Sequence, residues 1–95
     1  MQRQRRYFVG EAYQPDGADA AAGSASDAAA ALAGEGRTVR HLWSLFDPED
    51  ELCLHLFEAD SAETVAELGR RAATPFDRVW AAVRLGEADA GMTTT

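Results

Sequence analysis

Both histidines of the chain and its single cysteine lie in one segment, HLWSLFDPEDELCLHLF, at positions 41–57. Two apolar runs flank an acidic centre that contains Pro48, a pattern that predicts a β-hairpin. His41 lies on the first run and His55 on the second. Imidazole nitrogen suits nickel, zinc and copper, and two histidines on neighbouring strands can hold one ion. A metal site is therefore the first chemistry that this segment suggests.

The register of the hairpin decides whether the two imidazoles meet. A three-residue loop, 47–49, would place His41 directly opposite His55, with Cβ atoms about 4.5–5.5 Å apart. A five-residue loop would leave them diagonal on the same face. A four-residue loop built on DPED would send them to opposite faces, because a one-residue slip inverts the side-chain pattern. Pro48 fits the second position of that turn, so the sequence favours the register that separates the histidines.

Two further residues are candidates for the same chemistry. Glu11 is a third candidate metal ligand, because its strand is expected beside the strand of His55. The alternative is that Glu11 pairs with Arg40, Arg78 or Arg84, or lies at a rim, since an unpaired buried carboxylate is costly. Cys53 could be a soft ligand or a nucleophile beside His55. Residues two apart on a strand lie about 7 Å apart, however, and free cysteines are often buried, which favours an inert core thiol.

Aromatic residues suggest a second kind of site, a pocket for a flat organic molecule. Pockets of this kind have mostly apolar walls and a few polar groups, and in an enzyme His55 would serve as general acid or base. The same aromatic residues also suit a dimer interface, so both interpretations stay open. The predicted pocket residues are Arg40, Trp43, Ser44, Cys53 and Trp80.

Periodicity and turn signals predict the elements that position these residues. Their order, β-α-β-β-α-β, is typical of the ferredoxin-like α+β fold, a four-stranded antiparallel sheet with two helices on one face. Asp60 is the expected N-cap of the second helix, with Glu63 closing a capping box. We expect one domain at 1–86 and a flexible tail at 87–95. The strands are predicted at 6–13, 38–46, 51–59 and 76–85, and the helices at 18–36 and 60–73.

The uncovered face of this sheet is too hydrophobic to remain in water. Leucines at 52, 54 and 56 alternate with Cys53, His55 and Phe57, so both faces of one strand are largely apolar. A ligand or another protein could cover this surface, but the simplest solution is a homodimer that packs two sheets together. The sequence therefore predicts a dimeric α+β barrel.

Composition limits the partners and the compartment. The 95 residues carry a formal charge of -7 at pH 7, which argues against nucleic acid as a partner. No apolar run approaches the roughly 20 residues of a membrane helix, and the N-terminus lacks the apolar stretch of a signal peptide. A single cysteine cannot form an internal disulfide, which fits a reducing compartment. We expect a soluble cytoplasmic domain.

Two stretches, TVRHLWSLFDPEDELCLHLFEADSAETVAE and RRAATPFDRVWAAV, carry a family resemblance over most of residues 38–83. They resemble the small ferredoxin-like proteins of actinobacteria that include a nickel-binding protein, a family otherwise recorded as a domain of unknown function. The pattern CLHLFEADSAE with PFDRV is the most specific part, and YFVGEAY fits as well, with Glu11 at an often acidic position. The resemblance implies a dimeric ferredoxin-like protein and the binding of nickel or another divalent metal.

Two functional hypotheses follow. The first is a homodimeric, non-enzymatic protein that binds a divalent transition metal, nickel foremost, for sequestration or homeostasis, with Glu11, His41 and His55 as candidate ligands. The second is a small cyclase, isomerase or decarboxylase that acts on an aromatic or polyketide-like metabolite in the predicted pocket, with His55 as its acid or base and Arg40 steering an anionic group.

Overall fold

The computed structural model describes residues 6–85, so the predicted tail at 87–95 lies outside the described residues. Its elements follow the predicted order β-α-β-β-α-β. The last strand is shorter at both ends than the predicted 76–85, and Phe76, just before it, packs against the core. The elements are β1 (Tyr7–Tyr13), α1 (Ala18–Gly34), β2 (Val39–Asp47), β3 (Leu52–Ala59), α2 (Ala62–Arg71) and β4 (Arg78–Ala82).

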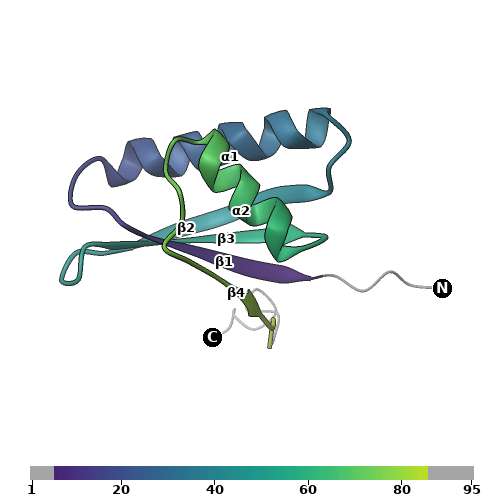
Figure 1. The fold of residues 1–95 in the computed structure, drawn as a ribbon. Coiled ribbons are helices and arrows are strands. Elements are labelled where there is room, and N and C mark those ends of the chain that lie inside the picture. Colours follow the sequence, from purple (N-terminus) through teal and green to yellow (C-terminus); the bar gives the residue numbers. More distant parts are fainter. Residues whose placement is uncertain (1–5, 86–95) are drawn as a thin grey trace, which may run out of the picture.

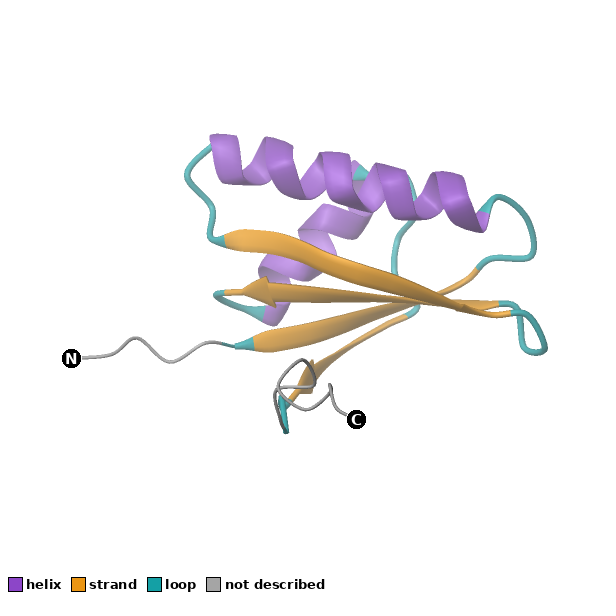
Figure 2. Ribbon diagram, turned by 180° about the vertical axis from the view of Figure 1, so that it is seen from behind, coloured by secondary structure: helices purple, strands orange, loops and turns teal. Residues whose placement is uncertain are grey.

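The four strands form one antiparallel sheet in the order β2-β3-β1-β4. Both helices lie on the same side of this sheet and leave its other side uncovered (Figures 1 and 2). This arrangement confirms the predicted ferredoxin-like fold. We call the two sides the covered face and the open face. No helix within residues 6–85 is long and apolar enough to cross a membrane.

Helix α1 packs on the sheet through small side chains. Its buried positions are mostly alanines, with Leu32 fully buried near the C-terminal end. Alanine is the best helix former and lets the helix backbone approach the strands closely. The helix begins after Gly17, whose φ of 74° is left-handed, and it continues through Gly23 without a break. A long helix thus covers β2, the strand that carries His41.

Helix α2 begins one residue later than the sequence predicts. The side chain of Ser61, and not that of Asp60, accepts the backbone N–H of Thr64 at 3.2 Å. Asp60 instead accepts the Thr64 hydroxyl at 2.8 Å, and the expected capping role of Glu63 is not seen. The buried Thr64 hydroxyl also accepts a hydrogen bond from Arg37, which ties the α1–β2 connection to this helix.

The ring of Phe76 fills the space between the sheet and α2. A Cβ atom added at Gly10 on β1 would lie 2.6 Å from its ring, and one added at Gly69 on α2 would lie 2.9 Å away. The ring centroid of Phe76 also lies 5.9 Å from that of the fully buried Phe57 and 5.6 Å from that of His55. The two glycines therefore leave the space that lets Phe76 close the core beside His55.

We predict that Gly10→Ala destabilises the fold by about 1–3 kcal/mol, the usual cost of overpacking a core. Gly23→Ala is the matched control, because Gly23 lies inside a helix with nothing within 4 Å of an added Cβ. It should stabilise the fold by about 0.5–1 kcal/mol. Urea unfolding of the three proteins measures both changes. Equal stability of Gly10→Ala and the wild type would contradict the close packing of Phe76 against Gly10.

Candidate functional site

The hairpin loop has the predicted length but is displaced by one residue. Asp47 pairs with Leu52, so the loop comprises residues 48–51, and Glu51 takes a left-handed φ of 57°. The Asp47 carboxylate accepts the backbone N–H groups of Glu49 and Asp50 and so holds the turn. Extended along both strands without interruption, this register would place the two histidines on opposite faces.

A β-bulge at Leu42 reverses that outcome. The register shifts between His41 and Trp43, so His41 pairs with Phe57 while Ser44 pairs with His55. Because the bulge inserts one extra residue, His41 moves to the covered face, where His55 lies. The two imidazole centroids are 6.2 Å apart. The prediction that the turn separates the histidines is therefore wrong.

Ser44 joins the two imidazoles through its hydroxyl group. The Ser44 Oγ lies 2.9 Å from the Nε2 of His41 and 2.6 Å from the Nδ1 of His55. One hydroxyl proton can be donated to only one of these nitrogens, so the other ring donates its own N–H to the oxygen. Two ring nitrogens are thus directed at one point between the strands.

Burial keeps both imidazoles neutral at pH 7. His55 is 1% exposed, and its desolvation, helped by the nearby His41, lowers its pKa to about 4. Burial also lowers the pKa of the half-buried His41, against a smaller opposing effect of its hydrogen bond to the Trp43 backbone. A metal ion binds the neutral form of histidine. The pair is therefore in the protonation state that a metal requires.

The third predicted metal ligand lies on the other side of the sheet. Glu11 pairs in register with Arg78 on the open face, where its carboxylate lies 3.5 Å from that guanidinium. The same carboxylate accepts the indole N–H of Trp80 at 2.6 Å. Glu11 thus forms an ion pair with an arginine, which was the alternative to metal binding. The three predicted ligands do not share a site. Within residues 6–85, no group of three or more His, Cys, Asp or Glu side chains is arranged to hold a metal ion.

The predicted pocket is likewise divided between the two faces. Ser44 and Cys53 lie on the covered face, whereas Trp43 and Trp80 lie on the open face. Cys53 is 2% exposed, and burial, helped by the charge of Asp19, raises the pKa of its thiol. It is a protonated core residue. Because His55 faces the helices, it cannot act as an acid or base on a molecule bound over the open face.

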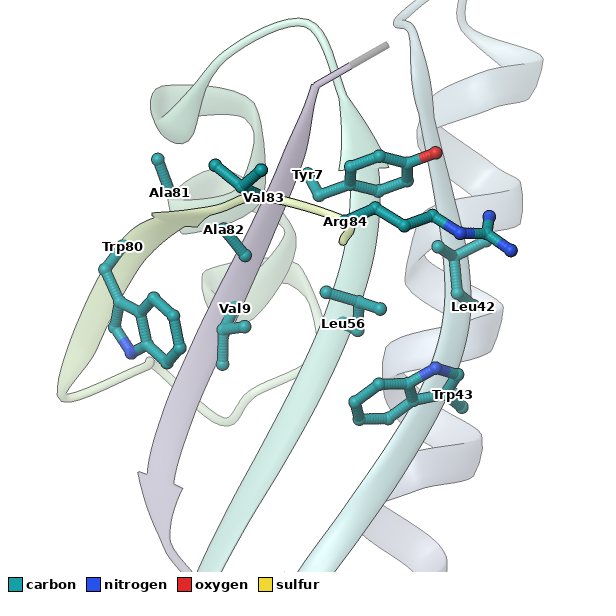
Figure 3. Close-up of a pocket in the computed structure, with 10 residues that line it drawn as sticks. All are labelled: Tyr7, Val9, Leu42, Trp43, Leu56, Trp80, Ala81, Ala82, Val83 and Arg84. Atoms are coloured by element: carbon teal, nitrogen blue, oxygen red, sulfur yellow. The ribbon is translucent and has the colours of Figure 1, made fainter. Parts of the chain in front are cut away.

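The open face carries a groove of about 720 Å³. One row of register partners crosses the groove, in which Trp43 pairs with Leu56, Leu56 with Val9, and Val9 with Trp80. The two indoles stand at the sides of the groove and the two aliphatic residues form its floor (Figure 3). A cross-strand row of this kind depends on pairings across four strands, which is why the sequence alone did not reveal it.

The arginine at the groove is not the one that the sequence suggested. Arg40 forms an ion pair with Glu58 at 2.8 Å and does not line the groove. Arg84, which follows β4, lines it instead, and its side chain extends past Tyr7 towards Leu42 (Figure 3). The alternation at 76–85 placed Arg84 on the Trp80 face, so that pattern was the available signal.

Comparison with known proteins supports the fold. No family model and no curated protein matches the chain. Among solved structures, the chain is similar to SCO4226 from Streptomyces coelicolor A3(2), with a TM-score of 0.64 and 23% sequence identity. The likeness covers 85% of this chain and 99% of that one. At this identity it establishes the shared architecture and nothing further.

Proposed function

We propose that the protein is a small cytoplasmic binding protein for a divalent transition metal ion, nickel foremost, which it sequesters through His41 and His55. One observation carries the proposal, namely that two neutral imidazoles point at the single oxygen of Ser44, at 2.9 and 2.6 Å. Imidazole is a preferred ligand of nickel, copper and zinc. The resemblance to a family that includes a nickel-binding protein agrees with this choice of metal.

The number of ligands indicates how tightly the ion would be held. Structural zinc sites use four protein ligands, whereas sites with fewer keep open positions for water or another molecule. Here His41 and His55 supply the two strong ligands, and Ser44 contributes at most a weak oxygen. The remaining positions go to water. Such a site suits reversible uptake and release, as expected for a binding protein in metal homeostasis.

We predict that nickel binds the wild-type protein and that His41→Ala weakens binding by at least about tenfold, since even the outer-shell partners of a ligand are worth that much. Isothermal titration calorimetry measures both affinities. His41 is the residue to change, because it is half-buried, whereas truncating the fully buried His55 would open a cavity. Affinity should be lost only at a lower pH than for two ordinary imidazoles, because burial lowers the pKa of both ligands, that of His55 to about 4.

Glu11→Gln is the control for this titration. Its carboxylate lies on the open face beside Trp80 and Arg78, so nickel affinity should stay at the wild-type level. Equal binding by the wild type and His41→Ala would remove the histidine pair as the site. The absence of binding by either protein would remove the proposed function.

We further propose that the protein is a homodimer that packs through the open face. Two of its most exposed large side chains, Tyr13 at 59% and Leu45 at 56%, lie on this face beyond the groove, towards the hairpin loop. Leu52 and Leu54 of β3 extend the same apolar surface between them. An apolar sheet face of this kind marks an interaction site, and a second copy offers a matching surface by symmetry.

We predict that Leu45→Glu converts the dimer to a monomer of unchanged fold, because it places a charge in the centre of the proposed contact. Light scattering after size-exclusion chromatography, over a series of protein concentrations, measures the mass. Ala30→Glu, on the exposed side of α1, is the matched control and should remain dimeric. A wild-type protein that is monomeric throughout the series would contradict the proposed dimer.

A further inference from the structure

We infer that the Ser44 hydroxyl competes with the metal ion for the two imidazoles and so limits how tightly the ion is held. This inference rests on the proposed metal-binding function and identifies a residue that sets its affinity. The geometry carries it, because Ser44 Oγ lies 2.9 Å from His41 Nε2 and 2.6 Å from His55 Nδ1. These are the two nitrogen atoms that would hold an ion between the rings.

The hydroxyl oxygen and the ion cannot occupy this position together. The lone pair of an imidazole nitrogen lies in the plane of the ring and points in one direction, and here a hydrogen bond to Ser44 takes that direction. Metal–nitrogen bonds are about 2.0–2.1 Å long for zinc. An ion at that distance on the line from His55 Nδ1 to Ser44 Oγ would lie about 0.5 Å from the oxygen. The hydroxyl therefore has to leave this position.

Turning Ser44 away breaks both hydrogen bonds. The residue is half-buried on β2, an edge strand of the sheet, so its side chain can change to another staggered rotamer. His55 is 1% exposed, so water does not readily replace the hydroxyl at its ring. Two hydrogen bonds together correspond to a factor of about ten to a hundred in an equilibrium constant. The wild-type affinity for the ion should be lowered by this factor.

The same hydroxyl also fixes a proton that has to move. Since one hydroxyl proton serves one of the two nitrogens, the other ring donates its N–H to Ser44 Oγ. A metal binds a histidine nitrogen that carries no proton. In that ring the proton must therefore pass to the other nitrogen when the ion is bound. Both costs come from Ser44, and both favour release of the ion.

The test is calorimetric titration of nickel into the full-length protein after removal of bound metal. Ser44→Ala should bind nickel about ten- to a hundredfold more tightly than the wild type. The sign is decisive, because loss of a residue that only supported the rings would weaken binding. Ser44→Thr keeps the hydroxyl and should bind like the wild type. Ser26→Ala, on the exposed side of α1, is the matched control and should also bind like the wild type.

Long-range ¹H–¹⁵N NMR of the wild type gives a second readout that needs no substitution. Added zinc should change the tautomer of one of the two rings, and unchanged tautomers in both would overturn the inference. Equal or weaker nickel binding by Ser44→Ala, or equal gains in Ser44→Ala and Ser44→Thr, would also overturn it and leave the proposed function standing. The absence of nickel binding by the wild type and by both Ser44 variants would remove the proposed function as well.

Discussion

The extra residue in β2 at Leu42 is the constraint on which both candidate sites depend. Without the bulge, the Asp47–Leu52 register would send His41 to the face opposite His55. With it, His41 and Ser44 both face the helices, three positions apart, and Ser44 bridges the imidazoles. The bulged Leu42 and the following Trp43 line the groove on the other side. One irregularity in one strand thus shapes both faces.

The sheet separates two environments with opposite chemistry. On the covered face, burial favours neutral groups and leaves His55 uncharged among Phe57 and Phe76. On the open face, the Glu11 carboxylate lies beside the Arg78 guanidinium and accepts the indole N–H of Trp80. For the proposed metal ion, the covered face provides two imidazoles that burial keeps neutral. The residues predicted to form one pocket are therefore divided between these two environments.

Local pattern was sufficient for the fold. Alternation in 51–59 and the turn signals around it predicted a strand with two different faces, and β3 is that strand. Which face is buried could not be predicted, because both carry apolar residues. The bulge could not be predicted, because Leu42 is neither glycine nor proline and its neighbours favour regular strand. The one indication of the bulge in the sequence was that two polar residues, His41 and Ser44, flank two apolar ones. Arg84 was missed because its position at the groove depends on how β4 ends beside β1.

The most direct test of this account is the pKa of each imidazole, followed by long-range ¹H–¹⁵N NMR of the labelled protein during an acid titration. The account predicts that His55 stays neutral until about pH 4, that His41 titrates below 6.5, and that proton contacts link the two rings. Added zinc, a diamagnetic substitute for nickel, should shift both rings together. Titration of both rings near 6.5 with no contact between them would contradict the shared, buried site.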